Sequence, residues 1–313
     1  MLLKSGSGTF RSFYFFCMKI LITGANGFLG YYLIQRLLFL KHKVVATGKG
    51  DCRLPFSEDS NFIYAPMDFT DPFAVHDVFE KFQPEVVVHA GAMSKPDECE
   101  EQQWQAYLVN VEGTLTTLMN AAEQKSFFIF VSSDFIFDGE KGMYKEDDEP
   151  NPVNYYGKTK LEAEEIVKEY EYDWAIVRTV LVYGKPILSR PNILSIVKGK
   201  LEKGEMYNVV DDQSRTPTYV GDLAEGIVQI INKKAKGVYH LSGKDILTPY
   251  QMACKAASFL RLNNALISRV TADSFSQIAK RPPKTGFVID KARTELGFDP
   301  LSFDEGLIKT FAL

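Results

Sequence analysis

The sequence predicts an α/β fold, namely a doubly wound parallel Rossmann sheet followed by a smaller C-terminal lobe. Three observations lead to this prediction. Apolar runs alternate with helical stretches up to about residue 185, a glycine-rich turn joins the first run to the first helix, and the rhythm loosens afterwards. Continuous apolar runs are typical of strands buried on both faces of a parallel sheet. Right-handed crossovers between such strands give a doubly wound sheet.

The elements of the predicted sheet follow from the apolar pattern. Five strands are expected at 18–23, 43–48, 61–68, 85–92 and 126–133, with helices at 28–43, 73–82 and 106–124. Further along, 237–243 has the pattern of another such strand, with helices at 222–232 and 248–260. We expect residues 18–185 to form the Rossmann domain and strand 237–243 to return to it. Residues 186–313 should form mainly a substrate-binding lobe.

The first 17 residues differ from the rest of the chain. Their apolar segment "FYFFC" is shorter than the apolar region of a signal peptide, which takes about 7–15 residues. Met18 opens the first convincing strand. We therefore expect residues 1–17 to be a non-native or upstream-start extension, the alternative being a short edge or interface segment.

Composition excludes several classes of function. The net charge of −4 comes without a basic run, so nucleic-acid binding has no electrostatic support. The four cysteines and four histidines are scattered, with no metal-ligand spacing and no disulfide framework. No apolar run approaches the roughly 20 residues of a membrane span. We expect a cytoplasmic protein without a metal site or a membrane partner.

The segment "TGANGFLG" lies between the first predicted strand and the first helix. Its three glycines allow a tight turn, a close approach of the backbone to a pyrophosphate, and close helix–strand packing. The N-terminus of the following helix offers N–H groups to phosphate. This placement predicts a dinucleotide site, the alternative being a glycine-rich turn without a ligand. The residues expected at the cofactor are Gly24, Asn26, Gly27, Phe28, Leu29 and Gly30.

The end of the second strand bears on the choice between NAD and NADP. An acidic residue there would bind the ribose 2′-hydroxyl, but the sequence has Gly48 followed by Lys49 and Arg53. This favours NADP over NAD, with Lys49 contacting the 2′-phosphate. The alternative is that Lys49 is an ordinary solvated lysine. Asp68, at the end of the third strand, is expected either to bind the adenine amino group or to cap the helix beginning near Asp71.

The stretch "NYYGKTK" predicts a helix that begins near Tyr155 and is capped by Asn154. Tyr156 and Lys160 are one turn apart on the inward stripe, whereas Tyr155 points about 100° away. Lys158 falls on the outer side. An ammonium beside a phenol favours the phenolate and lowers its pKa, which would let Tyr156 exchange a proton near neutral pH. The alternative is a tyrosine–lysine contact on an ordinary helix.

With these motifs the chain resembles the extended short-chain dehydrogenases/reductases, and within them the dTDP-4-dehydrorhamnose reductases. The supporting motifs are "TGANGFLG", "VVVHAGA", "VNVEGT", "VSSDFIFDG", "YKEDDEPNPVNYYGKTK", "VRTVLVYG" and "RPP". A more distant resemblance is to the regulatory beta subunit of methionine adenosyltransferase, which keeps the fold without an established reductase role.

The resemblance implies a role for each matching residue. Ser133 matches the catalytic serine or threonine that donates to the substrate carbonyl. Tyr156 matches the proton donor, and Lys160 matches its partner, which also binds the nicotinamide ribose. Further cofactor positions match Ala90, Gly91, Ala92, Asn110 and Arg178, and Asp134 and Phe135 stand where the family contacts sugar.

Two departures from the relatives affect the substrate. Dehydratases carry an acidic pair after the serine or threonine, whereas Asp134 is followed by Phe135, so water elimination is disfavoured. The segment 211–224 shares only its outline with the reductases. In it we expect Gln213 and Arg215 to contact the nucleotide diphosphate. The alternative for Arg215 is a surface salt bridge to Asp211 or Asp212.

These motifs and the resemblance together predict an NAD(P)H-dependent reductase of a 4-keto-deoxy-sugar nucleotide, with a homodimer possible. The cofactor would supply the hydride, Ser133 would polarise the carbonyl, and Tyr156 would supply the proton. The alternatives are a sugar-nucleotide epimerase that keeps its NAD bound, and a non-catalytic regulatory subunit that only binds cofactor.

Overall fold

A computed structural model describes residues 17–187, 191–275 and 277–312, so the predicted N-terminal extension lies outside it except for Cys17. Within these residues a seven-stranded parallel sheet has the order β10-β6-β5-β4-β1-β2-β3. This confirms the predicted Rossmann fold class. The strands are β1 Lys19–Thr23, β2 Lys43–Gly48, β3 Phe62–Pro66, β4 Val86–His89, β5 Phe127–Ser133, β6 Trp174–Thr179 and β10 Gly237–His240.

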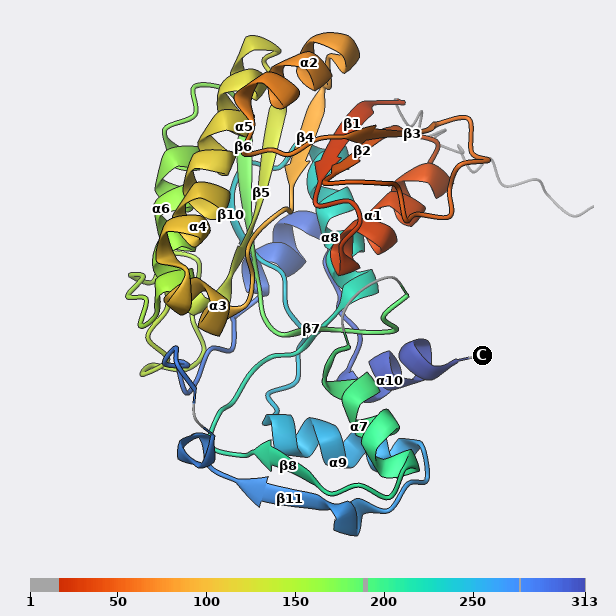
Figure 1. The fold of residues 1–313 in the computed structure, drawn as a ribbon, viewed down its shortest axis with the longest axis vertical. Helices are drawn as coiled ribbons and strands as arrows, with labels where there is room; N and C mark the ends of the chain where they lie inside the picture. Colours follow the sequence, from red (N-terminus) through yellow and green to blue (C-terminus); the bar gives the residue numbers. More distant parts are fainter. Residues whose placement is uncertain (1–16, 188–190, 276, 313) are drawn as a thin grey trace, which may run out of the picture.

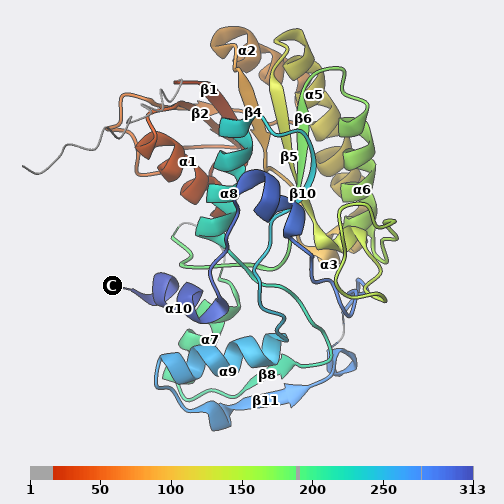
Figure 2. The same ribbon diagram turned by 180° about the vertical axis from the view of Figure 1, so that it is seen from behind.

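Helices cover both faces of the sheet, as Figure 1 and Figure 2 show from opposite sides. One face packs against α1 Phe28–Phe39 and α8 Val220–Lys233, and the other against α2 Pro72–Phe82, α5 Gly113–Glu123 and α6 Tyr155–Lys168. Neighbouring strand residues belong to opposite cores. Ile20 and Ile22 face α1 and α8, whereas Leu21 faces the other layer. This alternation explains why each strand is apolar along its whole length.

The single helix predicted at 106–124 is wrong in detail. The chain forms α4 Gln103–Tyr107, a π-helical turn Leu108–Glu112, and then α5. The hydroxyl of Thr114 donates to the carbonyl oxygen of Asn110 at 2.7 Å. Residue spacing in a short window does not separate a π turn from an α turn, and such turns are frequent at functional sites.

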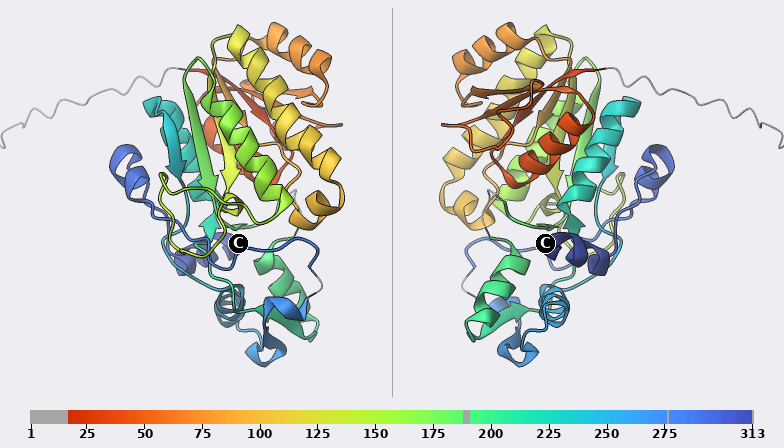
Figure 3. Two further views of the ribbon diagram at one scale, coloured as in Figure 1. Left: turned by 90° about the vertical axis from the view of Figure 1, so that its left-hand side faces the viewer. Right: turned by 90° about the vertical axis from the view of Figure 1, so that its right-hand side faces the viewer.

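A second, smaller group of elements lies at one end of the sheet, as Figure 3 shows from two sides. Its longer elements are α7 Ile193–Glu202, β8 Tyr207–Val210, α9 Pro249–Phe259, β11 Ile267–Val270 and α10 Phe303–Phe311. Strands β8 and β11 pair in parallel, and α7 and α9 pack beside them around Val197 and Met252. The remaining short elements are α3 Pro96–Glu101, β7 Val182–Tyr183, β9 Thr218–Tyr219, three 3₁₀ turns at Asp134–Ile136, Asn264–Leu266 and Ala272–Ser274, and a π turn at Ala292–Leu296.

The later part of the chain returns to the large sheet. β10 pairs in parallel with β6, and α8 packs beside α1. A domain boundary at residue 185 therefore stays a prediction, because elements on both sides of it build the same core. Among the described residues, no helix is both long and apolar enough to cross a membrane.

Candidate active site

The glycine-rich turn after β1 packs directly against the chain that leaves β4. Gly24 has a φ of 67°, and a Cβ added there would lie 2.8 Å from the Cα of Gly91. Only glycine fits both the left-handed conformation and this close approach. Gly30 is buried in the first turn of α1, and Phe28 and Leu29 are half-buried beside it. No side chain caps the N-terminus of α1 at Gly27, so its first N–H groups can serve an anion.

Asn26 ties the turn after β1 to the loop after β2. Its amide donates to the carbonyl oxygen of Asp51 at 3.1 Å and to the hydroxyl of Tyr64 at 2.9 Å. Its Oδ1 accepts from the N–H of Arg53 at 3.0 Å. These bonds fix both loops, while the predicted contact between Asn26 and a cofactor stays a prediction.

Lys49 and Asp68 lie side by side at the carboxyl ends of β2 and β3. The Nζ of Lys49 is 2.8 Å from the Oδ2 of Asp68, and the side chain of Lys49 is exposed while that of Asp68 is half-buried. Asp68 also accepts from the N–H and hydroxyl of Thr70, whereas Asp71 caps α2. Asp68 is therefore not the cap of this helix, one of its two expected roles, and its role at an adenine stays a prediction.

Asn110, in the π turn, joins two parts of the site. Its Oδ1 accepts from the N–H of Met93 at 2.8 Å, and its Nδ2 donates to the carbonyl oxygen of Met93 at 3.1 Å and to Thr159 at 3.0 Å. Ala90, Gly91 and Ala92 immediately precede this anchored position. Asn110 thus fixes the chain after β4 against α6, and direct contact with a cofactor is untested.

Helix α6 begins where the sequence predicts. The side chain of Asn154 accepts from the N–H of Gly157 at 2.9 Å, and a Cβ at Gly157 would lie 2.1 Å from the carbonyl oxygen of Phe135. The glycine therefore lets α6 start against the turn that follows β5. Tyr156 is 9% exposed and Lys160 is 2% exposed. Tyr155 is half-buried and Lys158 is exposed, as expected from helical spacing.

The predicted lowering of the Tyr156 pKa does not hold in this structure, whereas the partnership of Tyr156 with Lys160 stays a prediction. Burial raises the pKa of Tyr156 above its usual value, the charge of Asp134 raises it further, and a hydrogen bond with Ser133 opposes the shift. Loss of hydration at the buried phenol outweighs any attraction to the ammonium. The ring of Phe135 packs edge-on against Tyr156 with centroids 5.7 Å apart.

Lys160 is itself strongly perturbed. Burial lowers its pKa to about 7, with the charge of Glu164 opposing the shift. Its Nζ lies 3.9 Å from the centroid of the Phe130 ring. Across residues 17–187, 191–275 and 277–312, its ammonium makes no hydrogen bond to another side chain or carbonyl. The amine is therefore poised to change its charge near neutral pH.

Arg178 is committed to a buried ion pair. Its guanidinium contacts the carboxylate of Glu164 at 2.7 Å and donates to the carbonyl oxygen of Glu146 at 3.1 Å. The pair fastens β6 to α6, and the structure adds nothing for the expected cofactor contact of Arg178. Sequence reasoning missed Glu164, although its spacing of four residues from Lys160 places it on the same inward stripe.

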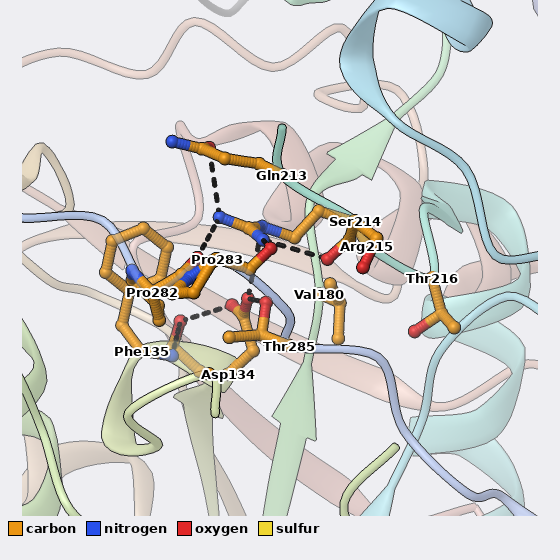
Figure 4. Close-up of polar contacts among 12 residues, drawn as sticks. Asp134, Phe135, Val180, Gln213, Ser214, Arg215, Thr216, Pro282, Pro283 and Thr285 are labelled. Atoms are coloured by element: carbon orange, nitrogen blue, oxygen red, sulfur yellow. Dashed lines mark hydrogen bonds and ion pairs between the residues drawn. The ribbon is translucent and has the colours of Figure 1, made fainter. Parts of the chain in front are cut away.

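Arg215 and Asp134 form a second buried cluster, drawn in Figure 4. Arg215 is 5% exposed, and its Nε lies 3.9 Å from the Oδ2 of Asp134. Its terminal nitrogens donate to the carbonyl oxygens of Ser214, Pro282 and Pro283 at 2.8, 2.7 and 3.1 Å and to the Oε1 of Gln213 at 3.2 Å.

The alternative for Arg215, a surface salt bridge to Asp211 or Asp212, is wrong, because Arg215 is buried and Asp211 pairs with Arg269 at 2.8 Å. The expected phosphate contacts of Arg215 and Gln213 stay predictions. A phosphate would have to displace protein acceptors from this guanidinium. Thr285, which donates to Asp134, was missed by sequence reasoning because it lies 151 residues further along the chain.

The arrangement fits a dinucleotide and a polar substrate. The Gly24–Gly91 contact and the uncapped α1 leave backbone at the carboxyl edge of the sheet, and Ser133, Tyr156 and Lys160 come from β5 and α6 at the same edge. Among the described residues, no group of three or more His, Cys, Asp or Glu side chains is arranged to hold a metal ion. The chemistry on offer is thus proton donation and hydrogen bonding.

Comparison with known proteins supports the same view. Residues 18–312 match the family model described as RmlD substrate binding domain. Methionine adenosyltransferase 2 subunit beta from Bos taurus is 33% identical over 270 residues, covering 84% of this chain and 78% of that protein. The spore coat polysaccharide biosynthesis protein SpsK from Bacillus subtilis is 30% identical over 290 residues, covering 92% and 95%.

Solved structures resemble this one over nearly the whole chain. A dTDP-4-dehydrorhamnose reductase from Clostridium acetobutylicum has a TM-score of 0.83 and 30% identity, covering 94% of this chain and 98% of that one. A dTDP-4-dehydrorhamnose reductase from Bacillus anthracis, in complex with NADP, has a TM-score of 0.82 and 28% identity, with the same coverage of 94% and 98%.

Proposed function

Because this chain belongs to the RmlD substrate binding domain family of extended short-chain dehydrogenases/reductases, we propose that it reduces the 4-keto group of a deoxy-sugar nucleotide. The observation that carries the proposal is that Ser133 ends β5 while Tyr156 and Lys160 lie buried in the first turns of α6, which starts against the turn after β5; the Gly24–Gly91 contact lies at the same carboxyl edge of the sheet. A carbonyl placed there would face a hydroxyl, a protonated phenol and a titratable amine.

NADP is the proposed cofactor, with NAD as the alternative. The Bacillus anthracis relative was crystallised with NADP. Lys49 follows the end of β2, and a basic residue in that position would favour binding of a ribose 2′-phosphate. The turn from Gly24 to Gly30 would hold the pyrophosphate, and Lys160 would hold the nicotinamide ribose. When bound, the reduced cofactor supplies the hydride.

The protein's own groups then handle the carbonyl oxygen. Ser133 would donate a hydrogen bond that polarises it. Because burial raises the pKa of Tyr156, the phenol keeps its proton at neutral pH and can donate it as the oxygen becomes an alcohol. Hydrogen bonds between the nicotinamide ribose and the buried amine of Lys160 would favour its charged form, and Lys160 would then contribute a positive charge near the carbonyl oxygen.

The test compares the two neighbouring tyrosines. Tyr156→Phe should abolish oxidation of NADPH in the presence of 4-keto-deoxy-sugar nucleotides, and Tyr155→Phe should leave most of it. A screen of such substrates with NADPH and NADH in parallel, read from the absorbance of the reduced cofactor, gives both substrate and cofactor preference. Equal losses in the two variants would contradict the role of Tyr156.

A second candidate is a cofactor-binding regulatory subunit. The match to methionine adenosyltransferase 2 subunit beta, over 84% of this chain, favours it. In that case the protein should bind NADPH, reduce none of the keto sugars, and co-purify with a partner enzyme whose rate or substrate affinity it changes. If Tyr156→Phe still changes the partner enzyme in this way, the regulatory effect does not depend on the residue proposed to donate the proton in the reduction.

A further inference from the structure

The carboxyl of Asp134 is buried immediately behind the active-site serine. Ser133 Oγ donates to its Oδ1 at 3.0 Å, and the hydroxyl of Thr285 donates to its Oδ2. The Nε of Arg215 lies 3.9 Å from the same Oδ2 (Figure 4). Asp134 is 3% exposed, so these groups and not water determine its charge.

Two of the three partners come from distant parts of the chain. The segment 279–285 crosses from the smaller group of elements to the active-site edge, where several groups hold it. Arg281 pairs with Asp97, Asn154 donates to the carbonyl oxygen of Lys280 at 2.7 Å, and Arg215 donates to two prolines. The position of Thr285 against Asp134 is thus fixed by the same segment that contacts the N-cap of α6.

A serine hydroxyl has one proton to donate. While Asp134 is ionised, it accepts that proton's hydrogen bond, and a substrate carbonyl must compete for it. If Asp134 carries a proton, its carboxylic acid can donate to Ser133 Oγ, and the serine proton is free to point into the cleft. The charge of Asp134 therefore selects the direction in which Ser133 donates.

We propose that Asp134 is a positioning residue whose charge sets the direction in which the Ser133 hydroxyl donates. Thr285 and Arg215 control that charge through their contacts with the carboxylate. The inference rests on the proposed reduction in one respect, since donation by Ser133 to a carbonyl is what the neutral form of Asp134 allows. The hydrogen bonds themselves can be tested without any substrate.

The groups around Asp134 give the sign of the effect. Burial raises the pKa of Asp134, whereas Arg215, Thr285 and Ser133 favour its charged form and lower it. The charge of Asp134 in turn raises the pKa of Tyr156 of α6 and opposes the lowering of the Arg215 pKa by burial. Removing the Thr285 hydroxyl should therefore raise the pKa of Asp134 and extend the pH range in which Ser133 donates to the cleft.

The first experiment titrates the carboxyl directly. Protein labelled with ¹³C at the aspartate carboxyl is followed by NMR, and the resonance lost in Asp134→Asn is assigned to Asp134. Thr285→Val should raise its midpoint by about one to two pH units, the size expected for one lost hydrogen bond to a charged group. Ser133→Ala should raise it in the same direction, and Thr285→Ser should restore the wild-type value.

Thr310→Val is the matched control, because its buried hydroxyl donates to a helix carbonyl oxygen in α10. It should leave the Asp134 midpoint and the turnover unchanged. An Asp134 midpoint that does not move in Thr285→Val overturns the proposal, whatever the substrate turns out to be. Equal circular dichroism spectra of the threonine variants establish that each one is folded.

The second experiment links the carboxyl to turnover. The alkaline limb of the pH profile of kcat should move upward in Thr285→Val by about the same amount as the carboxyl midpoint. In a Ser133→Ala background, adding Thr285→Val should not move the alkaline limb of the pH profile of the residual kcat. An alkaline limb that stays in place, or moves equally without Ser133, overturns the proposal. If the wild-type protein reduces no keto sugar but the midpoints move as expected, the proposed function fails and the positioning stands.

Discussion

Two buried basic side chains, Lys160 and Arg178, are both influenced by the charge of Glu164 but differ in their hydrogen-bond partners. Both are 2% exposed. Arg178 has a carboxylate at 2.7 Å, a carbonyl oxygen at 3.1 Å and the His240 ring nitrogen at 3.4 Å. Lys160 has the face of Phe130 at 3.9 Å and, among the residues the structure describes, no hydrogen-bond acceptor.

The difference separates a structural cation from one available for chemistry. Burying a charge is costly unless it is paired and hydrogen-bonded, and Arg178 meets that condition within the protein. Lys160 does not, so its pKa falls to about 7 and its donors stay available to a ligand. A buried basic side chain with unused donors is therefore a better guide to the site than burial or charge alone.

The largest expected effect is on turnover when Lys160 is replaced. Lys160→Met removes the titratable amine while keeping a similar shape, and it should lower kcat of the proposed reduction about 10²–10⁴-fold. Lys158→Met, two residues away on the exposed side, should stay within about twofold of wild type. Similar losses in both variants would contradict the assignment of Lys160 to the reaction. Steady-state oxidation of NADPH measures both.

Replacing Arg178 should instead affect stability. Arg178→Met leaves the carboxylate of Glu164 buried without its partner, and the free energy of unfolding should fall by about 3–5 kcal/mol in urea titrations. Adding Glu164→Leu to this variant removes the orphaned charge and should recover much of the loss. If Arg178→Met is as stable as wild type but lacks turnover, Arg178 acts in the site after all.

The lowered pKa of Lys160 should also make the free energy of unfolding depend on pH. Folding lowers this pKa from 10.5 to about 7, so the unfolded chain binds more protons between these values. The contribution of Lys160 to the free energy of unfolding therefore rises with pH through that window. Lys160→Met lacks this pH-dependent contribution. The free energy of unfolding of the variant should therefore exceed that of wild type most below pH 7, and the difference should shrink toward pH 10. Urea unfolding of both proteins at pH 6, 8 and 10 tests this, and a constant difference would contradict it.

Most strands of the sheet could be predicted because they depend on local pattern, although β6 Trp174–Thr179 was not among the expected ranges. The Asn154 cap and the spacing of Tyr156 and Lys160 lie within seven residues, and helical geometry decides which side chains face inward. The glycine turn was equally local in its positive φ at Gly24, whereas the close approach of Gly24 to Gly91 is a long-range contact that only the structure shows.

The electrostatics of the site could not be predicted in the same way. Whether Lys160 lowers the pKa of Tyr156 depends on how much water each group loses, which spacing does not specify. The partners of Arg215 include Pro282 and Pro283, some 67 residues away, and no local signal pairs them. Long-range contacts made through backbone carbonyl oxygens leave no residue-type signature in one sequence.

The smallest expected effect belongs to the exposed cation Lys49, which extends the comparison to the surface. It is paired with Asp68 at 2.8 Å in a solvated position, so Lys49→Ala should change the free energy of unfolding by less than about 1 kcal/mol. The variant leaves Asp68 without a counter-charge where a 2′-phosphate is proposed to bind. The affinity for NADPH should therefore fall about three- to tenfold while that for NADH changes little, as measured by fluorescence titration at low and high salt. Lys236→Ala, which opens an exposed pair with Asp173, is the control and should alter neither affinity. Equal weakening of both cofactors by Lys49→Ala would place Lys49 away from the 2′-phosphate and leave cofactor preference to the other basic residue of this loop, Arg53.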